Sequence, residues 1–242
     1  MISPAVNPVE RFSQAVANTE GWFAPDLLEV ILSISELQWA AGCRGWLVEW
    51  GVHHGRGLAA LALAAGPNDH VLGIDCFDRQ ELNRCGSGMG NLAATRRTLD
   101  AVLGPDHQVC LHSTDLRSFG TPELVKLLRV LPGGNAPIRI AHIDGDHTES
   151  GAMNDLGCAQ AAMDSFGIVL LDDVFNPDWP EVGAAFHQFL ARHGEWRAVG
   201  WAYGRAVLCR DEVAGSVQQV LKKFRYRKAV LRDRPFIVLE WQ

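Results

Sequence analysis

The sequence lacks the patterns that mark zinc sites, secreted proteins and membrane proteins. Its six cysteines form no Cys-x-x-Cys pair and no Cys/His spacing of a zinc site, so we expect reduced, mostly buried thiols. Residues 1–10 show no basic stretch followed by an apolar stretch, as a signal peptide would. No apolar run approaches the ~20 residues that span a bilayer. These absences favour a cytoplasmic protein with no membrane partner.

An overall excess of positive charge is also missing. The formal net charge is -6 and the pI is near 5.8, so no diffuse basic face can neutralise a phosphate backbone. Nucleic acid is therefore not expected as a partner. The 242 residues, 48% of them hydrophobic, suit one compact domain rather than two independent cores.

Short apolar runs alternate with helical stretches along most of the chain. A leading helix is predicted over 25–41, where leucine and isoleucine recur at helical spacing. Strands are expected at 46–50, 71–74, 108–111, 138–143 and 167–171, with helices at 57–65, 92–103, 122–131, 151–163 and 182–193. Such alternation is typical of βαβ units with a parallel sheet.

The last part of the chain departs from this alternation. Two short strands, 199–202 and 206–209, are expected to form a hairpin across Tyr203-Gly204, followed by a helix to Phe224 and a final strand at 236–241. We therefore predict an α/β fold, a doubly wound, Rossmann-like and mostly parallel sheet with antiparallel C-terminal strands. It forms a single domain over 1–242, with a helical N-terminal segment at 1–42, a cofactor-binding core at 46–210 and a helix-strand extension at 211–242.

The loop after the first predicted strand is rich in glycine. It reads G-x-x-x-G-x-G from Gly51 through Gly55 to Gly57, with Glu49 two residues before it. This differs from the G-x-G-x-x-G of nicotinamide-dependent oxidoreductases, although their fold would suit the chain. Asp75 ends the second strand, 24 residues after Gly51, where a carboxylate can accept hydrogen bonds from both hydroxyls of an adenosine ribose. The alternative is that Glu49 and Asp75 only cap nearby backbone.

Acidic residues end the fourth and fifth predicted strands. Asp144 and Asp146 follow one strand, and Asp172 and Asp173 follow the next. If the strands are neighbours, carboxylates this close repel unless a cation or protons intervene, and Mg²⁺ prefers oxygen ligands. The competing interpretation is helix capping by Asp146 and by one of the Asp172-Asp173 pair.

The histidine next to these acids, His147, is a candidate general base, because a neutral imidazole accepts a hydroxyl proton, and Asp146 is the rival base. His53 and His54 face either a substrate or the backbone, whereas His142, within a strand, is expected to be a core residue. The segment 78–91, polar and glycine-rich, is a candidate lid.

With these residues in view, residues 47–209 resemble the class I S-adenosylmethionine-dependent methyltransferases, in particular the bacterial branch called methyltransferase family 24. The resemblance is carried by Val48 to Gly55, Gly73 to Asp78, the Gln80 to Gly90 loop, Ile143 to Thr148, and Leu171 to Pro177 running into Trp179-Pro180. It implies that Glu49, Gly51 and Gly55 surround the methionine and ribose of the cofactor and that Asp75 binds the ribose. It also implies Ser113, Thr114 or Asp115 near the adenine, and Mg²⁺ held by Asp144, Asp172 and Asp173.

The resemblance further implies O-methylation of a sugar or glycan hydroxyl, so the expected partner is a small-molecule or oligosaccharide acceptor. Alternatives are another natural-product hydroxyl or amine, a nicotinamide-dependent oxidoreductase, and a non-catalytic scaffold. The intact acids at 144, 172 and 173 argue against a scaffold. Basic residues gather in the tail, 222–234. A solvated helix and strand is the simplest interpretation, and the alternative is that tail and leading helix form a homodimer contact or an acceptor wall.

Overall fold

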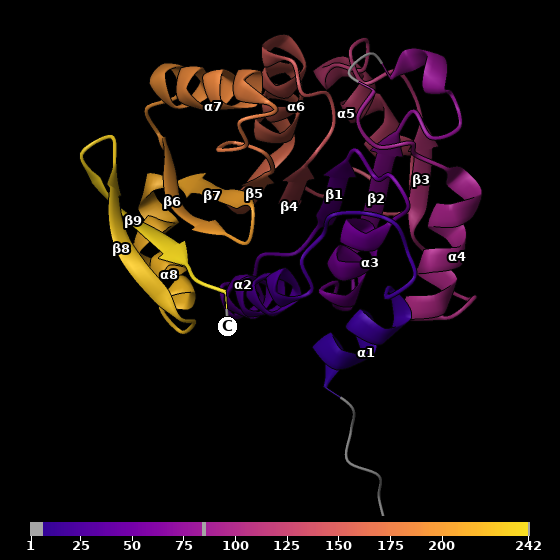
Figure 1. Ribbon diagram of the computed structural model, residues 1–242, viewed down its shortest axis with the longest axis horizontal. Helices are drawn as coiled ribbons and strands as arrows, with labels where there is room; N and C mark the ends of the chain where they lie inside the picture. The colour runs from indigo at the N-terminus through magenta and orange to yellow at the C-terminus, as the bar shows by residue number, and fades with distance from the viewer. Residues whose placement is uncertain (1–6, 84–85, 242) are drawn as a thin grey trace, which may run out of the picture.

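A computed structural model describes residues 7–83 and 86–241, and over these residues the fold is built on one large twisted sheet (Figure 1). The strands follow the order β3-β2-β1-β4-β5-β7-β6-β9-β8 across the sheet. Their bounds are β1 (Trp46–Trp50), β2 (His70–Asp75), β3 (Cys110–Ser113), β4 (Ile138–Ile143), β5 (Met163–Leu171), β6 (Trp196–Ala202), β7 (Arg205–Arg210), β8 (Tyr226–Leu231) and β9 (Arg234–Leu239). Strands β1 to β5 pair in parallel, whereas β7 is antiparallel to both β5 and β6.

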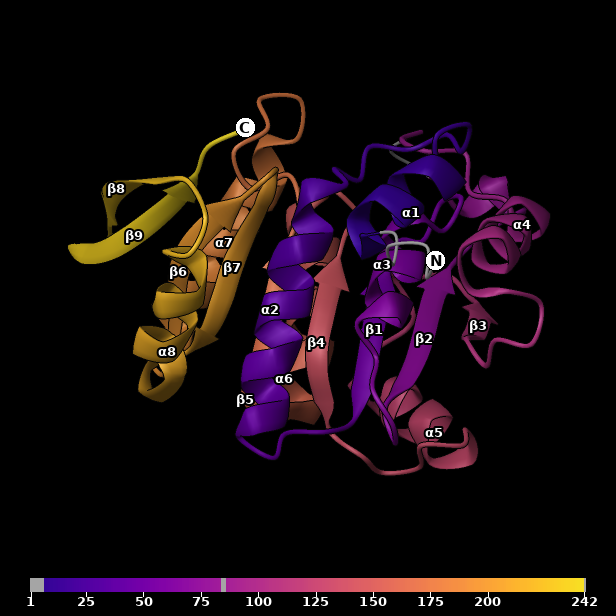
Figure 2. The same ribbon diagram turned by 90° about the horizontal axis from the view of Figure 1, so that it is seen from below.

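Helices cover both faces of the sheet, as Figure 1 shows with the sheet between an upper and a lower layer. The upper layer holds α5 (Thr121–Val130), α6 (Glu149–Ala162) and α7 (Pro180–Arg192). The other layer, in front of the sheet in Figure 2, holds α1 (Pro8–Ala15), α2 (Asp26–Ala40), α3 (Arg56–Leu63), α4 (Leu92–Leu103) and α8 (Asp211–Leu221). A short 3₁₀ helix, η1 (Gln80–Leu82), lies between β2 and α4. None of the helices in the described part of the chain has the length and apolarity that a membrane crossing requires.

The central strands are buried on both faces, which a parallel sheet between two helical layers requires. All residues of β1 and β4 are buried, and they belong to two apolar clusters, one on each face. Leu47 and Ile140 face the layer of α2, whereas their neighbours Val48 and Ala141 face the layer of α6. The alternation with period two follows from strand geometry.

A buried ion pair fastens α2 to the far end of the sheet from the glycine-rich loop. Arg139 of β4 donates to Asp69 over 2.9 Å, and both side chains are fully buried. Arg139 also donates to Ser35 and Gln38 of α2. Burial alone would raise the pKa of Asp69, but hydrogen bonds from the backbone N–H groups of Gly45 and Gly66, together with Arg139, lower it.

The structure confirms the predicted fold class, and the predicted β6–β7 hairpin turns at Tyr203-Gly204 with both residues at positive φ. Three elements were not predicted, α1, η1 and β8. Helix α1 is only eight residues long and starts at a cap by Asn7, and η1 has only three residues. Half of the residues of β8 are exposed, and the strand pairs only with β9. The five cysteines of the described residues are free thiols, and predictions for Cys85 and residues 1–6 fall outside that part.

Candidate functional site

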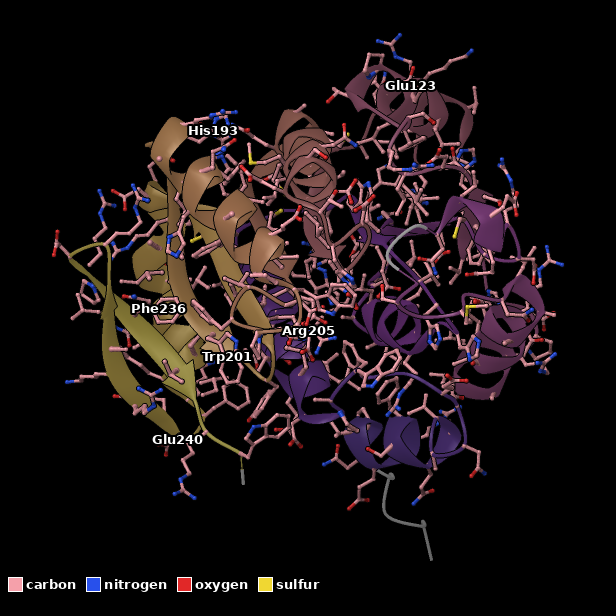
Figure 3. All side chains as sticks on the ribbon, turned by 45° about the horizontal axis from the view of Figure 1, so that its top comes forward. Glu123, His193, Trp201, Arg205, Phe236 and Glu240 are labelled. Carbon is pink, nitrogen blue, oxygen red and sulfur yellow. The ribbon has the colours of Figure 1, made fainter. Side chains whose placement is uncertain are left out.

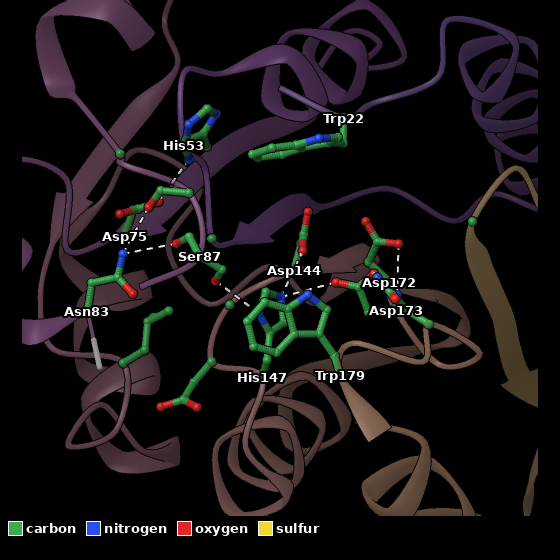
Figure 4. Close-up of a pocket in the computed structure, with 18 of the residues that line it drawn as sticks. Trp22, His53, Asp75, Asn83, Ser87, Asp144, His147, Asp172, Asp173 and Trp179 are labelled. Atoms are coloured by element: carbon green, nitrogen blue, oxygen red, sulfur yellow. Dashed lines mark hydrogen bonds and ion pairs between the residues drawn. The ribbon is translucent and has the colours of Figure 1, made fainter. Parts of the chain in front are cut away.

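A cavity of about 740 Å³ opens at the carboxyl ends of the parallel strands, where open α/β sheets bind ligands (Figure 4). The structure brings most of the predicted site residues to its wall: Gly51, Asp75, Asp115, Asp144, Asp146, His147, Asp172 and Asp173. Among the predicted residues, Glu49, Gly55 and Ser113 do not line this cavity. The volume falls within the range of small-molecule binding pockets in proteins.

The predicted glycine-rich loop is held tightly against the acidic strand end. Gly51 has φ +79°, and a Cβ there would come within 1.8 Å of the carbonyl oxygen of Asp144. Only glycine allows this approach of β1 to the end of β4. Gly55 has φ +86° and forms the start of α3 beside Thr95, so it shapes the loop from behind.

Asp75 at the end of β2 connects the glycine-rich loop to the segment that follows β2. One oxygen accepts hydrogen bonds from the backbone N–H groups of Val52 (2.6 Å) and His53 (2.9 Å). The other accepts from the N–H of Phe77 over 2.6 Å. The carboxylate therefore holds the glycine-rich loop in place and, at the same time, forms part of the cavity wall.

Glu49 lies below the loop rather than in the main cavity. Its Oε1 is 2.7 Å from Nδ1 of His142, and its Oε2 has no hydrogen-bond partner among the described residues. Burial, followed by the charge of Asp144, raises the pKa of Glu49 well above its usual value. A small second cavity beside the loop is lined by Glu49, Gly51 and His53, and Nε2 of His53 also has no partner among described residues. These two buried polar atoms fit a ligand that brings hydrogen-bonding groups to this end of the loop.

A buried chain of polar side chains runs from Glu49 to the acids. Nε of Arg205, on β7, donates to Nε2 of His142 over 3.3 Å, so the other ring nitrogen carries the hydrogen and donates to Glu49. Burial and Arg205 lower the pKa of His142 to about 3, so the ring is neutral at physiological pH. The interpretation of His142 as a core residue agrees with its exposure of 1%.

Arg205 also reaches the acidic strand ends, where its guanidinium lies 2.6 Å from Asp172 and 3.9 Å from Asp144. The arginine is 3% exposed and lies over the ring of Phe23. It supplies positive charge to the cluster, where the sequence led us to expect Mg²⁺ or protons. A lone arginine beginning the apolar run of β7 was the signal that could have pointed to it.

The acids form two overlapping groups rather than one trio. Asp144, His147 and Asp173 bring ligand atoms within 4.8 Å of one another, and so do His142, Asp144 and Asp172. Nε2 of His147 lies 3.2 Å from Asp173 and 3.5 Å from Asp144. Although burial alone would raise the pKa of Asp144, the hydrogen bond from His147 and the charge of Arg205 lower it. Carboxylates of Asp144 and Asp173 fit a hard divalent cation, whereas Asp172 is already paired.

The two candidate bases differ in their contacts. Nδ1 of His147 is 2.9 Å from the hydroxyl of Ser87, and its ring stacks on Trp179 with a centroid distance of 4.4 Å (Figure 4). Both ring nitrogens therefore face groups of the protein. Asp146 accepts a hydrogen bond from the N–H of Thr148 through Oδ1 over 2.8 Å, and no bond to Oδ2 is seen from any described residue.

At the predicted adenine end, Asp115 lines the cavity and pairs with Arg117 through two contacts of 3.0 and 2.8 Å. Ser113 instead donates to the carbonyl of Cys76, and the N–H of Thr114 donates to the carbonyl of Asp75. The predicted lid, as far as it is described, adds Asn83 and Ser87 to the cavity wall.

Aromatic residues in the wall were missed by the sequence analysis. They are Trp22, Trp179, Trp201, Tyr203 and Trp241, which come from four separate segments of the chain. No local pattern marks them, because the fold alone brings these segments together.

The family described as a methyltransferase domain matches residues 48–174 of this chain. Among solved structures, the chain is similar to the O-methyltransferase NovP, with 19% identity, a TM-score of 0.59, and 84% of this chain and 87% of that chain covered. It is also similar to the calicheamicin methyltransferase CalS11, described as a TDP-rhamnose 3'-O-methyltransferase. There the identity is 20% and the TM-score 0.55, with 87% of this chain and 94% of that chain covered.

A third similar structure is the mycinamycin-pathway methyltransferase MycE in complex with Mg, S-adenosylhomocysteine and mycinamycin VI. Its identity is 13% and its TM-score 0.54, with 86% of this chain and 55% of that chain covered. A search of curated proteins found no match. At these identities the structural similarities show only the fold, whereas the match to the family shows that the chain belongs to it.

Proposed function

The chain belongs to the methyltransferase domain family and is an S-adenosylmethionine-dependent methyltransferase, and from this premise we propose that it methylates a hydroxyl group of a sugar or glycan. The observation that carries this proposal is the shared cavity. The glycine-rich loop and Asp75 form one part of its wall, and the acids Asp144, Asp146 and Asp173 form the adjoining part. An acceptor hydroxyl between the two parts would lie beside carboxylates able to orient it.

The cofactor supplies an activated methyl group when bound. In this proposal Gly51 and the polar atoms near Glu49 and His53 receive its methionine part, Asp75 its ribose and Asp115 its adenine. The unsatisfied Oε2 of Glu49 and Nε2 of His53 support the first of these assignments. Asp75 has a double task, because its carboxylate also holds the loop through three backbone N–H groups.

We further propose a Mg²⁺ site on Asp144 and Asp173, with Asp172 as the third carboxylate beside it. Support comes from the oxygen-rich donor set and from the MycE complex, which contains both Mg and S-adenosylhomocysteine. A divalent cation there would lower the pKa of an acceptor hydroxyl. Arg205, bound to Asp172, would keep that carboxylate pointed toward the site.

The contacts favour Asp146 over His147 as the group that takes the hydroxyl proton. One oxygen of Asp146 accepts from the N–H of Thr148 and the other accepts no hydrogen bond from a described residue, whereas both nitrogens of His147 contact the protein. His147 then serves to position Asp144 and Asp173. Asp146→Asn should therefore lose about 10² to 10⁴ in kcat, the usual cost of losing a general base. If His147→Ala is dead and Asp146→Asn turns over normally, the proton goes to the histidine instead.

The experiment that tests the proposed function is mass spectrometry of a sugar and glycan panel incubated with methyl-labelled cofactor, with Mg²⁺ and after chelation. We expect label on a hydroxyl oxygen only when Mg²⁺ is present. Label on an amine, or on a natural-product hydroxyl but on no sugar, would contradict the acceptor assignment. Full transfer after exhaustive chelation would mean that the reaction needs no Mg²⁺. The acids would then serve only as partners of Arg205 and His147 and as helix caps.

A further inference from the structure

The cavity continues past the acids, away from the glycine-rich loop. Its far end is formed by the β6–β7 turn and the end of the chain, with Trp201, Tyr203, Gly204 and Trp241 in its wall. Gly204 brings this turn close to the acids, because a Cβ there would be 3.5 Å from Oδ1 of Asp172. If the methyl group is transferred beside the acids, as proposed above, the body of the acceptor must extend into this far end.

Aromatic rings dominate the far end. Trp241 remains 54% exposed and packs against the buried Tyr203 with a centroid distance of 4.8 Å. Trp201, on the adjoining strand, is partly buried, and Figure 3 shows Trp201 and Arg205 where the C-terminal strands meet the middle of the molecule. Trp22, 74% exposed, lines the cavity from the N-terminal segment. Exposed indoles beside a cavity are typical of surfaces that bind the apolar face of a ligand.

The charges of the wall limit what that ligand can be. Among the described residues of the wall, Arg117 and Arg205 carry the fixed positive charges, and each is paired with an aspartate. Asp178 adds negative charge to the wall, and Asp146 adds more near Arg117. At the far end, past the acids and the Mg²⁺ site proposed above, the described wall offers a diphosphate no unpaired arginine or lysine to replace its hydration.

We propose that Trp201, Tyr203 and Trp241 form the acceptor platform and that it takes an uncharged glycoside rather than a nucleotide-linked sugar. This inference rests on the proposed function. A pyranose ring presents C–H groups on a face, which pack on an indole, and hydroxyl groups at its edge. Those hydroxyls can donate hydrogen bonds to carboxylates such as Asp172, which lies beside Gly204, so the two kinds of wall residue match the two parts of one neutral sugar.

The test uses matched probes, each a methyl glycoside and the nucleoside-diphosphate derivative of the same sugar, beginning with methyl rhamnoside and TDP-rhamnose. Each is incubated with labelled cofactor and Mg²⁺, and the product is measured by mass spectrometry. We expect transfer to one or more methyl glycosides and a kcat/KM at least about tenfold lower for the matched nucleotide sugar. Preference for the nucleotide sugar of a pair would overturn the proposal, and so would transfer to neither set.

Variants then locate the platform. Trp241→Ala should raise KM for the accepted glycoside about tenfold while kcat changes little, and Trp241→Phe should restore most of the loss because it keeps an aromatic face. Val230→Ala is the matched control, since Val230 is 72% exposed on the same C-terminal hairpin but is not part of the wall. An unchanged KM in Trp241→Ala would remove Trp241 from the acceptor site.

Calorimetry with S-adenosylhomocysteine distinguishes a failure of the platform proposal from a failure of the proposed function. Trp241→Ala should bind it as wild type does, because the far end lies beyond the acids. If wild type binds this ligand and methylates a nucleotide sugar, the platform proposal fails while the proposed function stands. If wild type does not bind it at all, the proposed function fails first.

Discussion

Replacing Arg205 by methionine tests whether this arginine holds the acid cluster together. The guanidinium is nearly fully buried, 2.6 Å from Asp172 and 3.9 Å from Asp144. At an effective dielectric of about 20, those separations correspond to attractions of about 6 and about 4 kcal/mol. Desolvation of the arginine cancels much of this, and removing one partner of a buried pair costs about 3 to 5 kcal/mol in measured cases. We expect a loss of that size in the free energy of unfolding.

The loss should depend on Mg²⁺. Without Arg205, Asp144 and Asp172 repel each other more strongly, and a divalent cation becomes the remaining way to neutralise them. Mg²⁺ at about 100 times its Kd adds about 2.7 kcal/mol to the folded state of either protein, so the deficit shrinks only by the amount that Arg205→Met binds the cation more tightly than wild type does.

The assay is urea unfolding followed by tryptophan fluorescence, with and without Mg²⁺, on wild type, Arg205→Met and the control Arg227→Met. Arg227 lies exposed on the edge strand β8, so its replacement should change the unfolding free energy by less than about 0.5 kcal/mol. A deficit below about 1 kcal/mol in Arg205→Met would refute the account of the cluster. No stabilisation of either protein by Mg²⁺ would refute the proposed cation site.

Three further changes test other parts of the structure. Asp69→Asn should cost about 3 to 5 kcal/mol near neutral pH, because it leaves Arg139 buried without its partner. Since the pKa of Asp69 is lowered in the folded state, the cost measured by urea unfolding should shrink as the pH falls below about 3.9, and a constant cost would contradict this. Burial, followed by the charge of Asp146, raises the pKa of Asp155, so Asp155→Asn should gain melting temperature over wild type as the pH rises from about 5 to about 8. No such trend would mean that Asp155 is ionised in the fold. Asp75→Ala should weaken S-adenosylhomocysteine binding about 10- to 100-fold by calorimetry, with Asp75→Asn intermediate, and normal binding would remove the ribose assignment.

Much of the fold could be predicted because its signals are local. The buried strands β1 and β4 are mostly apolar, and α4 was predicted at its observed ends. Acids at the ends of adjacent parallel strands were expected to meet, and Asp144 and Asp172 do lie in one wall because β4 pairs with β5. The cofactor loop could be located because it directly follows the first of these strands.

The residues that could not be predicted act through long-range contacts. Arg205 is 33 residues from Asp172 along the chain, and only the antiparallel pairing of β5 with β7 places it beside the acids. The ring nitrogens of His147 contact Ser87 and Asp173, which lie on separate loops, so the sequence could not show that both nitrogens are engaged. The same holds for the platform around Trp241, which joins the end of the chain to the β6–β7 turn.

The central claim is that the cavity between the glycine-rich loop and the acids is a methyl-donor site. Calorimetric titration of the wild-type protein with S-adenosylhomocysteine, and separately with a nicotinamide dinucleotide, tests it most directly. The account predicts saturable binding of the adenosyl ligand at one site per chain and no heat with the dinucleotide. Binding of the dinucleotide, with no heat from S-adenosylhomocysteine or S-adenosylmethionine, would contradict it.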